Sequence, residues 1–422
     1  MNILPLSRSE FRARVAVVGG GPGRLVGKSS TITTLRDPRR LRAEVFAGLV
    51  TALALIPETI SFSIIAGVGP TVGLFTSVVF AMTISAVGGR PAMVSAAAGS
   101  IALVVAPLVR EHGIDYLIAA VFMGGAIQIV LGLGGVAKLM RFVPRSVMTG
   151  FVNALAILIF SAQVPHLIDT PWLVYPFVVS ALVIMTVLPR MTTAVQAPLV
   201  AITVLTVAAV IFGVDIPRVS DEGDMTGGLP TLGIPDVPLT WAMLGTITPY
   251  AIAIALIGLL ETLLTAQLVD EHTETQSNVR RESWGQGVTN VVVGAFGGMG
   301  GCAMIGQTMM NVKGCGARTR VSTFVAGLAL LGLMTIFGPV LAVIPMAALV
   351  AVMVVVSFTT MDWRSVAPST LRRAPWRETL AMLVTAGITV TTHNLAYGVI
   401  AGVLCAAVVA RTRRRTVAPQ VT

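Results

Sequence analysis

Apolar runs of about 20 residues recur along almost the whole chain, from Ala43 to Ala410. A helix needs about 20 mostly apolar residues to cross the hydrocarbon core of a bilayer, so each run is long enough for one crossing. The composition agrees, because 55% of the residues are hydrophobic and only 11% are charged, whereas soluble domains carry about 25% charged residues. The pattern predicts an all-α polytopic membrane protein.

The apolar runs can be delimited as fourteen transmembrane segments. The predicted spans are 44–66, 73–88, 92–109, 115–136, 146–165, 172–189, 195–213, 246–268, 285–297, 302–312, 319–337, 340–357, 377–392 and 394–410. If both termini are cytoplasmic, all of the 29 Lys and Arg except Arg110 and Arg218 lie on the inner side, as the positive-inside rule requires. We therefore expect a multi-pass protein of the cell inner membrane or plasma membrane, with both termini in the cytoplasm. The net charge of +10 is then explained by contact with anionic lipid, and no nucleic-acid partner is expected.

One long connection, rich in proline, glycine and acidic residues, divides the spans into seven and seven. An odd number of crossings in each half inserts the second half upside down relative to the first, which is the inverted-repeat plan of many secondary transporters. The predicted organisation is a basic cytoplasmic tail (1–43), a first seven-span repeat (44–213), an extracellular acidic linker (214–245), a second seven-span repeat (246–410) and a basic cytoplasmic tail (411–422).

Two carboxylates lie inside predicted spans. Glu261 is near the middle of the eighth span, where an ionisable group costs about 2.5–3.5 kcal/mol on insertion scales and normally faces a cavity, a partner or a passing ion. Thr265 is one helical turn later on the same face, so the two residues suit a cation or a proton. Glu58 follows Pro57 in the first span. For each acid the alternative is a structural hydrogen bond to a neighbouring helix.

The third and tenth spans open with Gly-rich stretches of small residues, at corresponding places in the two halves. Such paired interruptions indicate a substrate site near the middle of the membrane, since a helix that starts there offers free N–H groups and a positive dipole end to an anion. Close helix packing through small residues is the alternative. The candidate substrate-binding residues are Ser95, Ala98, Gly99 and Ser100 in the third span, and Gly301, Cys302, Ala303 and Met304 in the tenth.

Other kinds of site find little support. The three cysteines, Cys302, Cys315 and Cys405, show no metal-ligand spacing, so neither a metal site nor a disulfide framework is expected. The stretch GGGPGRLVGKSS resembles a phosphate loop, but Pro22 replaces its first glycine. No motif of a membrane-embedded enzyme is present, so we expect neither an enzyme nor a cofactor beyond a coupling ion. Gln128 and Asn153 are expected to form interhelical hydrogen bonds.

From about Arg42 to Ala410 the sequence resembles the SulP family of inorganic anion transporters, which includes sulphate and bicarbonate carriers. The resemblance rests on ALIPETISFSIIAGVGPTVGLF in the first two spans, GGRPAMVSAAAGSIAL in the third, IGLLETLLTAQLVDE in the eighth and GGMGGCAMIGQTMMNVKGCGARTRVST in the tenth. It implies a core domain from spans 1–4 and 8–11 and a gate domain from spans 5–7 and 12–14. It also implies an anion held between the third and tenth spans and a coupling ion at the positions of Glu261 and Thr265.

Three features depart from the family pattern. Ala97 and Ala98 replace a Pro and a Thr that many relatives carry in the third span. The surroundings of Gln307 lack the basic residue found in many relatives, which makes divalent sulphate a less suitable substrate. The cytoplasmic STAS domain common after the last span has no counterpart in the twelve residues that follow Ala410.

The predicted function is secondary active transport of a small inorganic anion, of the bicarbonate or sulphate class, by alternating access. Coupling to Na⁺ or H⁺ and a homodimeric assembly are expected. Two alternatives remain. A nucleobase-type permease would use Glu58 and Glu261 as its two carboxylates, and a passive anion channel would not need Glu261 to bind a cation.

Overall fold

The computed structural model describes residues 31–135, 144–168, 170–192, 196–223, 233, 235–238, 240–373, 375–392 and 395–416. Most of the predicted N-terminal tail, and part of the predicted linker at 214–245, lie outside these residues. The short helix α2 (Thr31–Arg36) precedes α3, which begins at Pro38. The Asp37 carboxylate accepts a hydrogen bond from the Arg39 N–H at 3.0 Å, so it caps α3 ahead of the apolar run.

Each predicted span corresponds to one element or to a strand followed by a helix. The first seven are α3 (Pro38–Ala66), α4 (Pro70–Val87), β1 (Ser95–Ala97) with α5 (Gly99–His112), α6 (Ile114–Leu133), α7 (Arg145–Ser161), α8 (Val174–Met191) and α9 (Ala197–Ile211). The second seven are α10 (Trp241–Thr273), α11 (Val279–Ala295), β2 (Gly301–Ala303) with α12 (Ile305–Met309) and η4 (Met310–Gly314), α13 (Arg320–Ala342), α14 (Met346–Thr360), α17 (Trp376–Thr392) and α18 (Leu395–Thr416).

The remaining described elements are short and connect these helices. They are η2 (Val164–Leu167), η3 (Val219–Glu222), α15 (Trp363–Val366) and α16 (Pro368–Arg373). The helix α18 continues to Thr416, so the first residues of the predicted basic tail, which begins at Arg411, are helical. Arginine has a high helix propensity, which lets a helix run on past its apolar part.

Seven helices of the described chain are both long enough and apolar enough to cross a membrane: α3, α4, α6, α7 with η2, α8, α10 and α13. Three shorter helical stretches are also apolar, Ala197–Ile211, Met346–Thr360 and Tyr397–Val408. The other predicted spans form helices that are shorter or less apolar than those.

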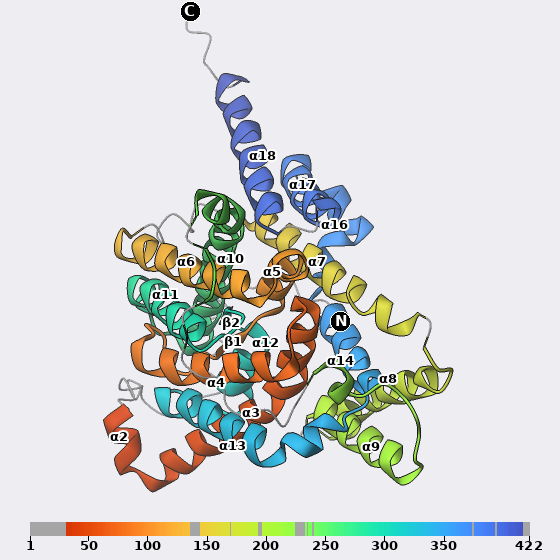
Figure 1. Cartoon of the computed structure of the whole chain (residues 1–422). Coiled ribbons are helices and arrows are strands. Elements are labelled where there is room, and N and C mark those ends of the chain that lie inside the picture. The colour runs from red at the N-terminus through yellow and green to blue at the C-terminus, as the bar shows by residue number, and fades with distance from the viewer. Residues whose placement is uncertain are drawn as a thin grey trace, which may run out of the picture.

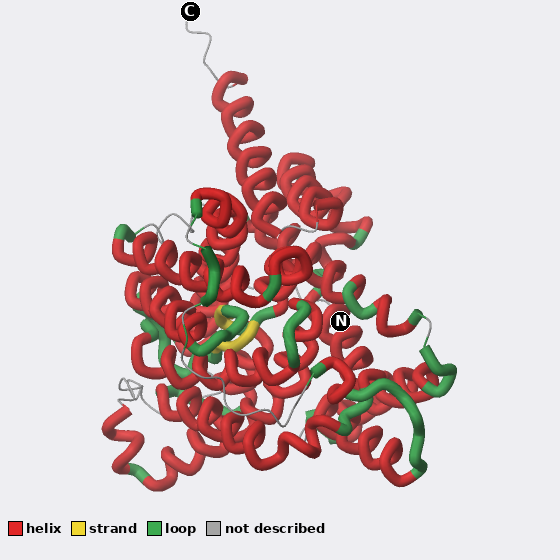
Figure 2. Tube along the Cα trace, in the orientation of Figure 1, coloured by secondary structure: helices red, strands yellow, loops and turns green. Residues whose placement is uncertain are grey.

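The third and tenth spans are not continuous helices. Each starts as a three-residue strand, and the two strands pair antiparallel, with Ser95 opposite Ala303 and Ala97 opposite Gly301. Figure 2 shows this pair at the centre of an otherwise helical molecule. Because no water is available inside a membrane, non-helical backbone there must be paired within the protein. The ladder between β1 and β2 satisfies that requirement and joins the two halves of the chain.

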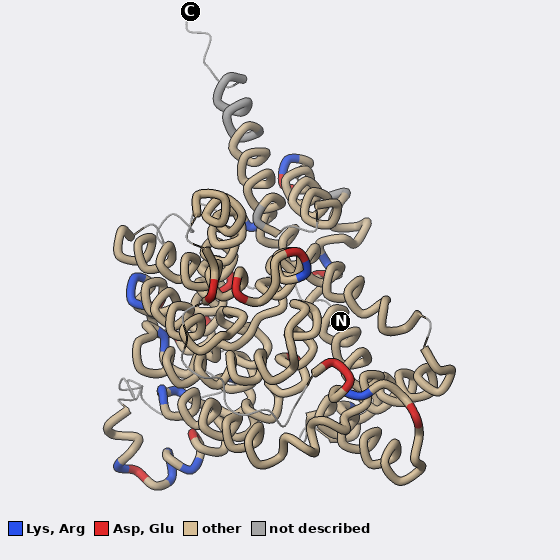
Figure 3. The backbone as a smooth tube through the Cα atoms, viewed as in Figure 1, with Lys and Arg blue, Asp and Glu red and all other residues tan. Residues whose placement is uncertain are grey.

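The helices form two groups. The core group (α3–α6 and α10–α13) packs around the strand pair, chiefly through contacts of α6 with α10 and α11 and of α13 with α3 and α4. The gate group (α7–α9, α14, α17 and α18) packs through contacts of α17 with α7 and α18, and of α8 with α9 and α14. The groups meet where α14 lies against α3 (Figure 1). Figure 3 shows that charged residues are sparse and gather in a few places.

Candidate anion and coupling-ion site

Glu261 lies within α10 and joins three segments of the core group. Its Oε2 atom accepts hydrogen bonds from the Ser100 hydroxyl, at 2.7 Å, and from the Cys302 thiol, at 2.7 Å. Ser100 is in the first turn of α5, and Cys302 is the middle residue of β2. The acid therefore contacts both interrupted spans at once.

The Thr265 hydroxyl is not directed at this carboxylate. It donates to the main-chain carbonyl of Glu261 at 2.8 Å, which is the usual back-bonding of a threonine within a helix. The hydroxyl oxygen still has an acceptor lone pair, because a hydroxyl offers two. A shared cation would have to use that lone pair together with the carboxylate.

Glu58 occupies an equivalent place in the other repeat. It lies on α3, with its carboxylate close to the side chain of Gln307. Gln307 is the third residue of α12 and is buried. Among the described residues the ion pairs are Arg40–Asp37 and Arg90–Asp270, so no basic side chain of that part of the chain neutralises either acid.

The two acids are related by the internal repeat. Glu58 and Thr59 of α3 match Glu261 and Thr262 of α10. The N-cap residues Ala98 and Met304 also correspond, and each half-helix has a glycine in its first turn, Gly99 in α5 and Gly306 in α12. Each acid contacts the residue after the glycine in the other repeat, so Glu261 meets Ser100 and Glu58 meets Gln307. The arrangement places one carboxylate beside the start of each half-helix, by which we mean α5 and α12.

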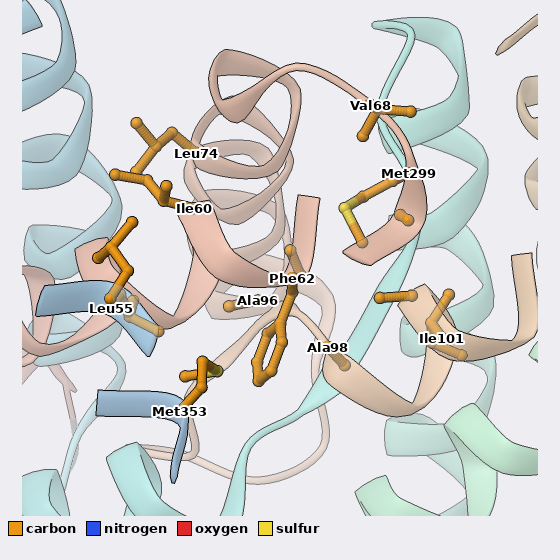
Figure 4. Packing of buried hydrophobic residues seen from close by; sticks show 14 of the residues in the cluster. Leu55, Ile60, Phe62, Val68, Leu74, Ala96, Ala98, Ile101, Met299 and Met353 are labelled. Carbon is orange, nitrogen blue, oxygen red and sulfur yellow. The ribbon is translucent and has the colours of Figure 1, made fainter. Parts of the chain in front are cut away.

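The start of α5 is covered in this structure. Gly99 is buried, and a Cβ atom there would lie 2.6 Å from the Phe62 ring. Figure 4 shows the Phe62 ring between Ala98 and Met353, and Met353 belongs to α14 of the gate group. Apolar side chains from both groups thus cover the predicted anion contacts at Ala98, Gly99 and Ser100.

The start of α12 is open by comparison. Ile305 is 39% exposed, and a Cβ atom at Gly306 would meet no atom within 4 Å. The N-cap residue Met304 makes no side-chain capping bond, so the first-turn amides of α12 have no partner from that side chain. Helix N-termini with such amides can accept an anion.

The helix start in the tenth span lies later than predicted. Gly301, Cys302 and Ala303 form β2, and Met304 is the N-cap. The Gly301 N–H donates to Asn290 Oδ1 at 3.1 Å and the Ala303 N–H to Thr262 Oγ1 at 3.2 Å, while the Met304 N–H donates to the Val94 carbonyl at 2.9 Å. These amides are already used, so the available ones belong to 305–307.

Ser95 also differs from the expectation. It lies in β1, four residues before the start of α5, and is fully buried. Its hydroxyl has no hydrogen-bond partner within the described residues. Ser95 therefore lies on the strand pair and outside the first turn of α5, and its contact with the anion stays a prediction. In the described part of the chain no group of three or more His, Cys, Asp or Glu residues could hold a metal ion.

A model of the sulfate permease family matches residues 41–174 and 169–385. The putative sulfate transporter YbaR of Bacillus subtilis (strain 168) is 54% identical over 368 residues, which cover 87% of this chain and 76% of YbaR. The chain belongs to the sulfate permease family. Another relative, the bicarbonate transporter BicA of Synechocystis sp., is 28% identical over 356 residues, which cover 77% of this chain and 62% of BicA.

Solved structures of similar fold place the helices in the same way. The transmembrane domain of a cyanobacterial BicA has a TM-score of 0.75 at 24% identity and covers 87% of this chain and 98% of that chain. The structure of SLC26A9 has a TM-score of 0.78 at 16% identity, covering 96% and 70%. The sulfate permease family and the seven-plus-seven inverted repeat with core and gate domains are thereby confirmed.

Three residues of the site were not predicted from the sequence: Phe62, Gly306 and Thr262. The sequence signal for Gly306 is that each of the two interrupted spans has a glycine just after its run of small residues, Gly99 in one and Gly306 in the other. Nothing in the sequence indicates that Phe62 covers α5, since an aromatic residue in an apolar span is ordinary.

Proposed function

We propose that this member of the sulfate permease family is a secondary active transporter of a small inorganic anion, of the bicarbonate or sulphate class, and that it works as a homodimer by alternating access. The observation that carries the proposal is the position of Glu261. This carboxylate has no basic partner among the described residues and bonds to the first turn of one half-helix and to the strand that leads into the other.

The anion is held by backbone dipoles in this proposal. The first turn of α12 presents amides and the positive end of a helix dipole, which favour an anion without a basic side chain. Glu261 then supplies the place for the coupling ion, either by taking up a proton or by binding Na⁺ with Thr265. Glu58 is the second candidate, because the repeat places it beside α12 itself.

Coupling is required on energetic grounds. An anion that enters a cell with a negative interior works against about 2.3 kcal/mol per charge for each 100 mV. Accumulation therefore needs a co-transported positive charge or exchange with another anion. A passive channel would only let the anion run downhill, and its selectivity would not require a buried acid.

Uptake by purified protein in proteoliposomes tests the proposal. Labelled bicarbonate, sulphate and uracil are offered with an imposed Na⁺ gradient, an imposed H⁺ gradient or neither. We expect one inorganic anion to accumulate above its outside concentration on one of the gradients. Accumulation of uracil would support the nucleobase-type permease, and equilibration without accumulation would support a channel.

The open start of α12 provides a test of the anion position. Gly306→Leu fills the space beside the first-turn amides, where a Cβ atom meets nothing within 4 Å, so the protein should fold. We expect the substrate affinity to fall on the order of tenfold or more, equivalent to about 1.4 kcal/mol. Isothermal titration with the transported anion measures this.

The control for Gly306→Leu is Gly387→Leu in α17, where a Cβ atom also meets nothing within 4 Å. This variant adds the same side chain in the gate group and should bind the anion normally. Equal affinities in the two variants would place the anion away from α12.

The proposed orientation has both termini in the cytoplasm. It follows from the positions of the basic residues, of which only two lie in predicted outside loops. A tag at either terminus should be reached only from the cytoplasmic side, and a tag inserted after Glu222 only from the outside. Protease protection in sealed vesicles measures this. Labelling of the two termini from opposite faces would contradict an even number of crossings.

A further inference from the structure

A chain of three side-chain amides runs through the interior of the core group. Gln128 of α6 and Gln286 and Asn290 of α11 are all fully buried. Polar groups inside a membrane protein are retained where they are hydrogen-bonded and useful. Gln286 and Asn290 both bond to Gly301, at the start of β2, and Gln128 bonds to Asn290.

Asn290 holds both backbone groups of Gly301. Its Oδ1 atom accepts from the Gly301 N–H at 3.1 Å, and its Nδ2 atom donates to the Gly301 carbonyl at 3.3 Å. Gln286 Nε2 donates to the same carbonyl at 3.0 Å. The residue next to Gly301 is Cys302, whose thiol bonds to Glu261. The position of Gly301 therefore sets where that thiol meets the acid.

Gln128 extends the chain to the helix that carries Glu261. Its Oε1 atom accepts from Asn290 Nδ2 at 2.8 Å, and its Nε2 atom donates to the carbonyls of Ile254 and Ala255 in α10 at 3.3 and 3.4 Å. A Cβ atom on Gly258 would lie 2.6 Å from Gln128 Nε2. Glycine at that position, one turn before Glu261, is what allows the amide to approach α10.

These hydrogen bonds connect α10 and β2 both directly and indirectly. Two bonds join α10 to β2 directly, Cys302 to Glu261 and Ala303 to Thr262. An indirect connection runs through Gln128, Asn290 and Gly301. We propose that Gln128 and Asn290 are positioning residues, which fix the Glu261 carboxylate against Cys302 and thereby set its affinity for the coupling cation. The cation part of this inference rests on the proposed function. The geometric part, that the two amides hold the Cys302 thiol against the Glu261 carboxylate, does not rest on the proposed function.

The first test measures the geometry without transport. Purified full-length protein is treated with N-ethylmaleimide, and mass spectrometry follows alkylation of Cys302 relative to Cys315 in the same molecule. In Asn290→Ala and Gln128→Leu we expect alkylation of Cys302 to accelerate about tenfold relative to Cys315. The reason is that the backbone at Gly301 is held less firmly, so the neighbouring buried thiol becomes accessible more often. Because Cys302 is buried and Cys315 is partly exposed, general unfolding would raise the same ratio, so only variants that melt and elute from size-exclusion chromatography like the parent protein are compared.

The matched control is Asn153→Ala. Asn153 is also a buried asparagine, but it lies in α7 and bonds to Ser365 and to the Asp362 N–H in the gate group. It should leave the alkylation ratio within about twofold of the parent. If Asn290→Ala does not fold, the test is made with Gln128→Met, which keeps the shape of the side chain and removes only its amide. Unchanged Cys302 alkylation in the folded Gln128 variants would overturn the proposal.

The second test measures the cation dependence of anion uptake in proteoliposomes. We expect Asn290→Ala to raise the half-saturating concentration of the coupling cation about tenfold, with a smaller change in the maximal rate per folded protein. A lowered rate at an unchanged half-saturating concentration would overturn the positioning role. If anion uptake by the parent protein does not depend on a cation, the proposed function is refuted. The alkylation test would still decide whether the amides position Cys302.

Discussion

Glu261→Gln is expected to stop gradient-driven accumulation of the anion while weak downhill movement persists. The amide keeps the size of the side chain and an oxygen that can accept from Ser100 and Cys302, so the contacts at 2.7 Å can be retained. It can neither take up a proton near neutral pH nor offer a negative charge to Na⁺. Folding should therefore survive while coupling is lost.

The measurement is uptake of labelled anion into proteoliposomes with and without the cation gradient. We expect the ratio of inside to outside anion to fall from well above one to one. The matched control is Glu271→Gln, which changes an exposed glutamate on the same helix whose carboxylate accepts from Gln267, and it should accumulate like the parent. If Glu261→Gln also concentrates the anion as the parent does, Glu261 is structural and Glu58→Gln is the next variant to measure.

Gly301→Ala is expected to destabilise the protein more than any other single-methyl addition at the site. A Cβ atom there would collide with the main-chain carbonyl oxygen of Ala96 on the opposite strand. Backbone cannot rotate away as a side chain can, so the strand pair must separate. Overpacking of a tight interior costs about 1–3 kcal/mol and occasionally more, and we expect the upper end of that range.

The readout for Gly301→Ala is the melting temperature in detergent together with the amount of protein in the membrane, and both should fall sharply. Gly332→Ala serves as the control, since it adds the same methyl group within α13 where a Cβ atom meets nothing within 4 Å. Alanine in a helix should be neutral or slightly stabilising there. Equal stability of the two variants would mean that β1 and β2 are not held as closely as described.

Much of the membrane architecture could be predicted from the sequence because hydropathy and charge placement act locally. The apolar runs locate most helix ends to within about six residues, and the seven-plus-seven division follows from one acidic, proline-rich connection. Glu261 could be recognised as unusual from its neighbours in sequence alone, since a carboxylate in an apolar run is costly wherever the run packs.

Short paired segments could not be resolved in the same way. The stretches that begin with Ser95 and Gly301 are apolar and small, which suits a helix start as well as a strand, and periodicity cannot separate the two over three residues. Their extended form depends on each other, through a ladder between segments about 200 residues apart. For the same reason, the backbone amides of the tenth span that remain available are those of residues 305–307, and not those of the predicted Gly301–Met304.

The sequence by itself determined that this chain is a helical membrane protein with an inverted repeat, that two acids lie within its spans and that small residues mark two interruptions. Only the tertiary structure decided which groups meet: Glu261 with Ser100 and Cys302, Glu58 with Gln307, and Phe62 over the start of α5. The physical reason is that hydropathy is a property of each segment, whereas hydrogen-bond partners and steric cover arise between segments that only the packed fold brings together.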